Sequence, residues 1–371
     1  MAIDSSFNTV DMMVNMGPQH PSTHGVFRMV LTVDGERIVN AEPYIGYLHR
    51  GTEKLCEGQN YRQCIELFDR LDYLSNFNNE LVFCMAVEKL MGLEVPQRAQ
   101  YIRVILSELN RITSHLMFYG AFGADAGAIT PFLYGFRERE RTQALFESVS
   151  GARMMHGYFR VGGLAQDVPA DFVKNVKELM PFLYQGIKEM DDLLSENDVF
   201  LPRTKGVGVL TAAEAIDLGV SGPILRACGV AEDLRRSDPY LVYDRLEFDV
   251  PVGQNGDCYD RYWVRMQEMY ESLKIIGQAI EQLPDGPIVA QLPRGMLRPP
   301  KGEAYARGEN PRGEFGVYVV SEGRDKPYRV KIRGPSFCNL MALKTLLKDA
   351  YIADSVVILG SVDIVLGDVD R

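Results

Sequence analysis

Two histidines on a short turn are the first candidates for chemistry in this sequence. His20 and His24 lie in residues 17–25, which read GPQHPSTHG and hold two of the five histidines of the chain. Two glycines and two prolines restrict the backbone here, so the turn can hold both imidazoles in one orientation. Since imidazole has a proton affinity near neutral pH, the pair favours proton transfer or metal ligation. Hydrogen bonding that only stabilises the turn is the alternative.

A second candidate is a group of polar residues at helical spacing, i, i+3, i+4 and i+7: Asp69, Asp72, Tyr73 and Asn76. This spacing predicts a polar stripe on a helix that is otherwise rich in leucine and phenylalanine. A tyrosine among carboxylates could donate a proton if the stripe lines a cleft. A helix face in contact with solvent is the alternative.

Asp125 is a single carboxylate between small residues in the segment Gly-Ala-Asp-Ala-Gly, 123–127. We expect it after the end of a helix over 98–118 and before a helix over 131–150. Another part of the chain could approach it closely there. Asp125 could cap a helix, or it could be the fixed anion that keeps a histidine protonated.

Arg50 lies in residues 49–54, His-Arg-Gly-Thr-Glu-Lys. This segment holds basic, acidic and histidine side chains within six residues. Its guanidinium could present positive charge to an electron carrier, or the segment could be a cluster of surface ion pairs. A further histidine, His115, is expected to be a hydrogen-bonded interior residue.

Composition excludes several classes of function. The 371 residues are 46% hydrophobic, enough for a large core, and their net charge of -10 argues against a nucleic-acid groove as the main function. The first basic residue is Arg28, so we expect neither an export signal nor a transit peptide. No apolar run is long enough to span a bilayer, and a membrane contact would be peripheral. The six cysteines include no Cys-x-x-Cys pair, which favours structural thiols in a reduced compartment.

Periodicity along the chain changes twice. Alternating residues over 25–45, with a turn at Asp34-Gly35, predict a β-ribbon, whereas the period from about 61 to 283 is helical. A second β-hairpin is expected around Glu322-Gly323, followed by a helix near 338–350.

The fold class is therefore α+β, mainly α, a central helical bundle with small β-sheet elements from both termini. The predicted segments of this one cooperative unit are a β-ribbon with the histidine turn (1–50), the helical bundle core (51–283), a Pro/Gly-rich surface loop (284–313), and a C-terminal β-hairpin, helix and tail (314–371).

Eight ordered motifs carry a resemblance that covers about 14–371. They are GPQHPSTHG, HRGTEKL, FDRLDYL, GADAGAITPF, GARMMHGYFRVGG, EFDVPVGQNGDCYDRY, GEFGVYVVS and SVDIVLGDVDR. Together they resemble the D subunit of respiratory complex I, the proton-pumping NADH-quinone oxidoreductase, a family related to the large subunit of nickel-iron hydrogenases. The resemblance implies a hydrogenase large-subunit-like fold whose two termini converge on one buried site.

Hydrogenases bind their metals through two Cys-x-x-Cys pairs, and the corresponding positions here contain no cysteine. The early position reads Leu-His-Arg-Gly-Thr-Glu at 48–53, and the late one reads Gly-Asp-Val-Asp-Arg at 367–371. The resemblance thus implies no metal in this chain and a vacated cavity that accepts a quinone, ubiquinone or menaquinone, as substrate.

Site residues carried over from the family are His24 and Tyr73 as ligands of the quinone headgroup, with Asp125 paired to His24. The resemblance also places Arg50 near the terminal iron-sulfur cluster of an adjacent subunit and His20 on the same loop as His24. The implied partners are an iron-sulfur subunit resembling B, a subunit resembling C and a membrane-arm subunit resembling H, with no nucleic acid. The implied location is peripheral, at the cytoplasmic face of the inner membrane. An energy-converting hydrogenase-related large subunit and a purely architectural subunit are the alternatives.

Overall fold

The computed structural model describes residues 11–20, 23–293 and 295–371. Residues 1–10, on which the expectation of no export signal partly rests, lie outside the described residues, as do Pro21 and Ser22 of the histidine turn. The helices are α1 (Thr52–Gly58), α2 (Tyr61–Phe68), α3 (Asn76–Met91), α4 (Gln97–Asp125), α5 (Thr130–Ser150), α6 (Phe172–Leu194), α7 (Phe200–Thr204), α8 (Ala212–Asp217), α9 (Pro223–Ala227), α10 (Leu234–Ser237), η2 (Tyr243–Arg245), α11 (Cys258–Glu281), α12 (Pro335–Leu340), α13 (Leu343–Leu347), α14 (Ile352–Val362) and α15 (Leu366–Asp370). The strands are β1 (Met12–Met16), β2 (Arg28–Asp34), β3 (Arg37–Tyr44), β4 (Phe159–Arg160), β5 (Gly163–Leu164), β6 (Gly302–Asn310), β7 (Gly313–Ser321) and β8 (Arg329–Arg333).

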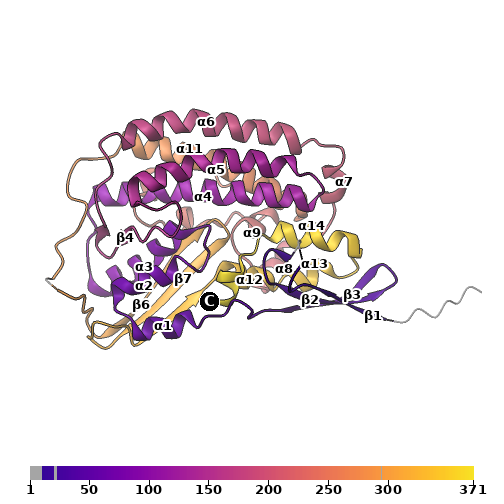
Figure 1. Ribbon diagram of the computed structural model, residues 1–371, viewed down its shortest axis with the longest axis horizontal. Coiled ribbons are helices and arrows are strands. Elements are labelled where there is room, and N and C mark those ends of the chain that lie inside the picture. Colours follow the sequence, from indigo (N-terminus) through magenta and orange to yellow (C-terminus); the bar gives the residue numbers. More distant parts are fainter. Residues whose placement is uncertain (1–10, 21–22, 294) are drawn as a thin grey trace, which may run out of the picture.

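The long helices α4, α5, α6 and α11 pack together as the predicted bundle (Figure 1). The apolar stripes of α4 and α11 face its interior, because residues three and four apart lie on one side of a helix. Ile105 and Ile112 of α4, with Met269 and Ile276 of α11, are fully buried. The helical period in the sequence therefore predicted both the helices and the faces that they bury.

Antiparallel sheets lie outside this bundle. The sheet β1-β2-β3 forms a ribbon at one end of the molecule, and the sheet β6-β7-β8 lies beside α2 and α3 (Figure 1). The predicted hairpin at 34–35 is confirmed, since Asp34 pairs with Arg37 across the turn. The hairpin around Glu322-Gly323 is also confirmed as β7 and β8. The prediction of an α+β fold, mainly α, is therefore confirmed.

The prediction that 284–313 is a loop throughout is wrong for its second half. β6 pairs with β7 from Gly302 opposite Ser321 to Asn310 opposite Gly313. The prolines that led to the loop prediction lie at 284–300 and at Pro311 in the turn, so none interrupts the ladder within the strand. The wider division into four segments remains a prediction.

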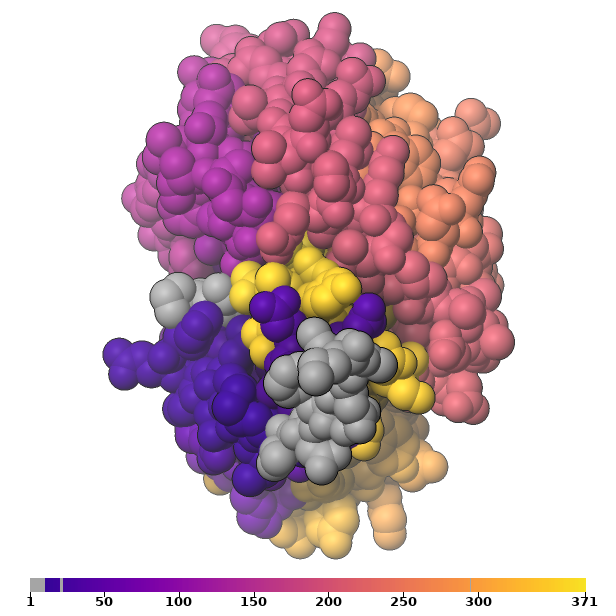
Figure 2. Space-filling model, turned by 90° about the vertical axis from the view of Figure 1, so that its right-hand side faces the viewer, coloured from indigo at the N-terminus to yellow at the C-terminus, as the bar shows by residue number. Residues whose placement is uncertain are grey.

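Segments from the two ends of the chain lie side by side. The Ile38 N–H donates to Ala350 O at 2.9 Å, and Asp349 N–H donates to Ile38 O at 2.9 Å. Figure 2 shows the C-terminal segments in yellow between the N-terminal ribbon and the helical bundle. The helix predicted near 338–350 is instead two short helices, α12 and α13, and α14 and α15 then bring the C-terminal residues into the core.

Candidate functional site

The turn that carries His24 has an unusual backbone. His24 has a φ of 51°, in the left-handed region, and Gly17 has a φ of 77°. A Cβ atom on Gly17 would stand 1.9 Å from Phe27 O, so only glycine fits. The buried Thr23 hydroxyl donates to His20 O at 2.8 Å. These constraints fix the direction in which the His24 side chain leaves the turn.

His24 contacts Asp125, as the resemblance implied. The His24 Nε2 atom lies 2.8 Å from Asp125 Oδ2, and the two side chains are 18% and 11% exposed. Burial lowers the pKa of His24, but the hydrogen bond and negative charge of Asp125, together with Asp363, outweigh burial and Arg312, so the pKa is raised. The pair therefore favours a protonated imidazole.

The local structure expected for Asp125 needs a correction. The preceding helix does not end at 118, because α4 continues to Asp125 as its last residue. Gly123 does not interrupt α4, and it gives close access to α5: a Cβ there would stand 2.6 Å from Pro131. Gly360 of α14 lies just as close, since a Cβ at that position would stand 2.5 Å from Asp125 Oδ2. The end of α4 thus presents the carboxylate beside the C-terminal segment.

Tyr73 lies in an irregular connection, so the prediction of a helical stripe over 69–76 is wrong. α2 ends at Phe68 and α3 begins at Asn76. Within the connection, the Leu74 N–H donates to Asp72 Oδ1 at 3.1 Å, a local bond of the kind with which aspartate competes with helix formation. Tyr73 is half-buried, and its hydroxyl has no hydrogen-bond partner among the described residues. Burial, followed by the charge of Asp72, raises the pKa of Tyr73.

A buried ion cluster lies between the elements that carry His24 and Tyr73. Arg312, in the turn between β6 and β7, donates to Asp72 Oδ2 at 2.8 Å and to Asp363 Oδ1 at 3.0 Å. The same guanidinium donates to Ser114 Oγ of α4 at 2.9 Å. The charges of Arg312 and Asp363 act on the pKa of both His24 and Tyr73. The phenol and the imidazole therefore share one electrostatic environment.

Sequence reasoning missed Arg312. It lay inside the segment interpreted as a loop, and its neighbour Pro311 was counted as a sign of irregular structure. The run Asn310-Pro311-Arg312-Gly313 is also a turn signal, and β-alternation continues after it. That signal could have identified the turn of a β-hairpin, although not the two aspartates that Arg312 binds.

Comparison with known proteins shows the family. A model of the family described as the 49-kDa subunit of respiratory-chain NADH dehydrogenase matches residues 125–298 and 292–371. A protein of Desulforamulus reducens, named as the D subunit of NADH-quinone oxidoreductase, is 53% identical over 98% of this chain and 100% of its own length. A protein with the same name from Bacillus mycoides is 53% identical over 98% of this chain and 99% of its own length. Another, from Dehalococcoides mccartyi, is 53% identical over 99% of this chain and 100% of its own length. The chain belongs to this family.

In the described part of the chain, Arg50 forms no hydrogen bond or ion pair with the His24–Asp125 pair or with the ion cluster, and it lies beside Arg70. It is exposed, donates to Arg70 O at 3.2 Å, and forms no ion pair among the described residues. Its neighbour Glu53 contacts Arg329 at 3.1 Å and Lys331 at 2.9 Å. The ion pairs of the alternative interpretation are thus present in this segment, but they leave the Arg50 charge uncompensated.

The C-terminal residues close this part of the surface. Asp370 accepts the N–H groups of Gly46 at 2.8 Å and Leu48 at 2.6 Å, and His49 Nδ1 lies 2.6 Å from Asp370 O. A hollow of about 330 Å³ there is lined by His49, Gly51, Glu53, Lys54, Arg329, Lys331, Asp370 and Arg371. Leu48 and His49 are therefore in contact with Asp370, and these residues lie in the two segments that the resemblance matches to the cysteine pairs of hydrogenases.

A second hollow is lined in part by residues of the histidine turn. Its lining residues are Pro18, Gln19, His20, Gly25, Val26 and Tyr47, and its volume is about 780 Å³. Most of its exposed lining surface is apolar. Gly25, the residue after His24, is among its lining residues.

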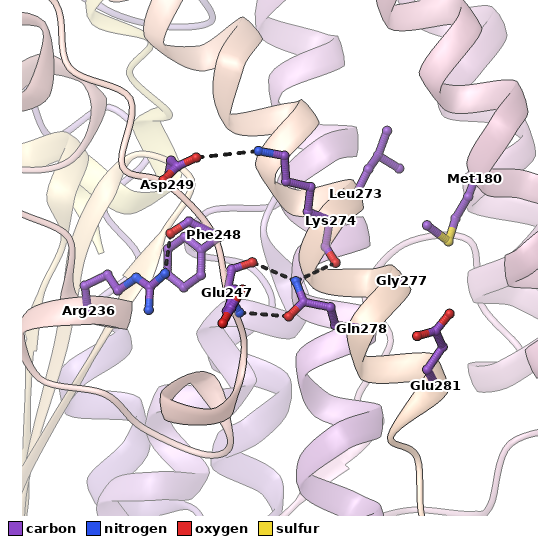
Figure 3. A pocket seen from close by; sticks show the side chains of 10 residues that line it. All are labelled: Met180, Arg236, Glu247, Phe248, Asp249, Leu273, Lys274, Gly277, Gln278 and Glu281. Atoms are coloured by element: carbon purple, nitrogen blue, oxygen red, sulfur yellow. Dashed lines mark hydrogen bonds and ion pairs between the residues drawn. The ribbon is translucent and has the colours of Figure 1, made fainter.

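A third hollow lies between α6, α11 and residues 247–249 (Figure 3). Its polar groups bind one another: Gln278 Nε2 donates to Glu247 O at 2.6 Å, and Lys274 Nζ lies 3.7 Å from Asp249 Oδ2. None of the site residues predicted from the sequence lines it.

Two findings concern metals and membranes. Within residues 11–20, 23–293 and 295–371, no group of three or more His, Cys, Asp or Glu side chains is arranged to hold a metal ion. In the same ranges, no helix has both the length and the apolar character needed to cross a bilayer.

Proposed function

We propose that this chain is the quinone-binding catalytic subunit of a multi-subunit NADH-quinone oxidoreductase, and that His24, Tyr73 and Asp125 form its quinone-reduction site. The observation that carries the proposal is that the His24–Asp125 pair and the Tyr73 hydroxyl, which no described residue binds, interact with the same buried ion cluster of Arg312 and Asp363. Membership of a family whose relatives are named as D subunits of NADH-quinone oxidoreductase supports the reaction class.

The chemistry requires two proton donors. Reduction of a quinone by two electrons places negative charge on two oxygens, and an unpaired charge in a poorly solvated site is very costly. Two donors aimed at those oxygens lower this cost as charge develops. His24 can give a proton that Asp125 helps it to hold, and Tyr73 can give the second from a hydroxyl that no described residue engages.

Proton transfer also changes the site. When His24 gives up its proton, the attraction between its ring and the Asp125 carboxylate is lost. Asp125 ends α4 and lies against Gly360 of α14, so a displaced carboxylate would disturb the contact between these two helices. We infer that this displacement is the first step by which redox chemistry drives ion pumping elsewhere in the complex.

The proposal also covers neighbours and location. Arg50 presents an unpaired positive charge beside the C-terminal segment, which suits a nearby iron-sulfur cluster held by a subunit resembling B. His20 lines the hollow through which the quinone enters. Subunits resembling C and H complete the surroundings, and the chain lies peripherally at the cytoplasmic face of the inner membrane.

The test is inhibitor-sensitive quinone reduction by membranes that carry Tyr73→Phe. The change removes one hydroxyl that has no hydrogen bond to any described residue, so assembly is expected to be retained while turnover falls roughly tenfold or more. Tyr328→Phe, which changes a 62% exposed tyrosine, is the control. Unchanged turnover and unchanged inhibitor sensitivity in Tyr73→Phe would remove this residue from the headgroup site and favour an architectural role.

A further inference from the structure

Two carboxyl groups lie together in the interior of the chain without a cation. Asp69, at the end of α2, and Glu80, in the second turn of α3, are both fully buried. Each carboxyl group acts on the pKa of the other. No lysine, arginine or histidine among the described residues forms an ion pair with either one.

The remaining contacts of the pair are backbone N–H groups of 157–159. Gly157 donates to Asp69 Oδ2 at 3.0 Å, while Tyr158 and Phe159 donate to Glu80 Oε2 at 2.9 and 2.7 Å. As carboxylates, Asp69 Oδ1 and Glu80 Oε1 would both be buried without a hydrogen-bond donor. One proton between these two oxygens gives each of them a partner, because a protonated carboxyl group is a donor.

We propose that Asp69 and Glu80 form a buried proton-binding site, in which one proton shared by the two carboxyl groups fixes the 69–75 connection against residues 157–159. The site lies outside the His24–Asp125 pair, and its ligand is a proton. Two adjacent carboxylates without a cation cannot both ionise at small cost, which is the general behaviour of carboxyl dyads. Burial raises the pKa of Asp69 to about 6, and burial followed by the Asp69 charge raises the pKa of Glu80 well above its usual range.

Charged and titratable groups surround the pair on several elements. Glu66 and Arg70 act on Asp69 from α2 and its end, and Arg160 acts on Glu80 from β4. Cys84 of α3 and Arg103 of α4 also interact with the Glu80 charge, but the Arg103 guanidinium already binds Glu88 at 2.6 Å. Glu66 is 49% exposed and reaches Gly157, where a Cβ would stand 2.4 Å from its Oε1. Glu66 thus marks the side from which protons could enter.

The shared proton matters for the residues that follow Asp69. The same connection carries Asp72, which binds Arg312, and Tyr73. Asn79 of α3 also holds it, since its side-chain amide donates to Asp72 O at 3.0 Å. Loss of the proton would place two adjacent negative charges at the start of the connection and push it away from α3. Any effect on quinone reduction rests on the proposed function, whereas proton binding does not.

The experiment measures unfolding of the full chain in urea from about pH 5 to about pH 8 for wild type, Glu80→Gln and the double variant Asp69→Asn/Glu80→Gln. In Glu80→Gln the amide oxygen keeps both backbone bonds and the amide nitrogen donates to Asp69, as the protonated acid does. The sign follows from linkage: a native pKa above the unfolded value means that stability is lost as pH rises through the native pKa. The unfolding constant of wild type relative to either variant should therefore rise with pH, by up to about tenfold per pH unit.

The control is Glu178→Gln, which removes a 66% exposed carboxylate of α6 that does not act on the pair, and its ratio to wild type should not change with pH. Three outcomes would overturn the proposal. These are a flat or falling ratio for Glu80→Gln and the double variant, an equal slope for Glu178→Gln, or failure of both variants to fold at every pH. The readout involves no quinone, so it stands or falls separately from the proposed reaction.

Discussion

His24 with Asp125 and His115 with Glu268 form two histidine–carboxylate pairs, each with Nε2 2.8 Å from a carboxylate oxygen. Their consequences are opposite. The pKa of His24 is raised, whereas burial lowers the pKa of His115 despite the hydrogen bond and charge of Glu268. A short contact between a histidine and a carboxylate therefore does not by itself determine whether the ring carries a proton.

The difference lies in the charges around each pair. Glu268 also accepts two hydrogen bonds from Arg226, at 3.0 and 2.7 Å, and Arg265 and Arg111 further disfavour a cationic His115. Asp125 forms its ion pair with His24 alone among the described residues, and Asp363 adds a second negative charge. His115 and Glu268 are both fully buried, while His24 and Asp125 are 18% and 11% exposed. One pair is thus part of the interior, and the other can exchange a proton.

The largest effect is expected from His115→Ala, and it should be on stability. The change removes a fully buried ring and leaves one oxygen of Glu268 without its donor, which should cost about 3–5 kcal/mol of unfolding free energy. Urea unfolding of the full chain measures it. A loss below about 1 kcal/mol would show that Arg226 alone satisfies Glu268.

His24→Ala should instead affect turnover. Loss of a positioned proton donor typically lowers a rate by about 100-fold or more, while a partly exposed side chain contributes little to unfolding free energy. The measurement is quinone reduction by the assembled complex, with electron transfer to a water-soluble acceptor as the check on assembly. If His24→Ala proved as destabilising as His115→Ala and left turnover unchanged, the contrast between the two pairs would be wrong.

Much of the scaffold was predictable because it follows from local patterns. The apolar stripe of α4 and the hairpin turn after Asp34 depend on neighbouring residues in the sequence. The interior position of His115 was predicted from the apolar face of its helix. Each of these features is determined by residues that lie close together in the sequence, within about one or two helical turns or one hairpin.

The parts of the site that were missed depend on contacts between distant segments. Tyr73 has helical spacing with its neighbours, yet it lies in an irregular connection whose Asp72 binds Arg312, a residue far away in the sequence. The Asp69–Glu80 pair was likewise invisible, because Glu80 lies in an apolar helix and its partners include the backbone of 158–159. The assignment of His24, Tyr73 and Asp125 as site residues rests on the resemblance and stays a prediction, because spacing alone left an alternative for each.

Asp125→Asn should sharpen the comparison through the pH dependence of turnover. The negative charge of Asp125 helps to hold the proton of His24, so its removal should lower the His24 pKa. Activity that requires the cationic ring would then be lost at a lower pH than in wild type, by about one pH unit. Quinone reduction across pH is the measurement. An equal displacement in Glu268→Gln would mean that the effect comes from general charge and not from this pair.

The smallest expected effect is on the pH dependence of stability. The change of relative stability with pH should have opposite signs for His24→Gln and His115→Gln. A raised native pKa gives stability that is present below about pH 6.5 and is lost as pH rises through the native pKa of His24. A lowered native pKa gives the reverse, because the unfolded chain takes up the proton first and stability is lost as pH falls below about 6.5. The stability of wild type relative to His24→Gln should therefore fall with rising pH, and that relative to His115→Gln should rise, each by less than about 1.4 kcal/mol per pH unit.

His156→Gln is the control for burial without a carboxylate. Burial lowers the pKa of His156 to about 4, so the stability of wild type relative to His156→Gln should change with pH in the same direction as that relative to His115→Gln. Slopes of the same sign for His24 and His115 would show that burial governs both pairs and that Asp125 does not keep its histidine protonated.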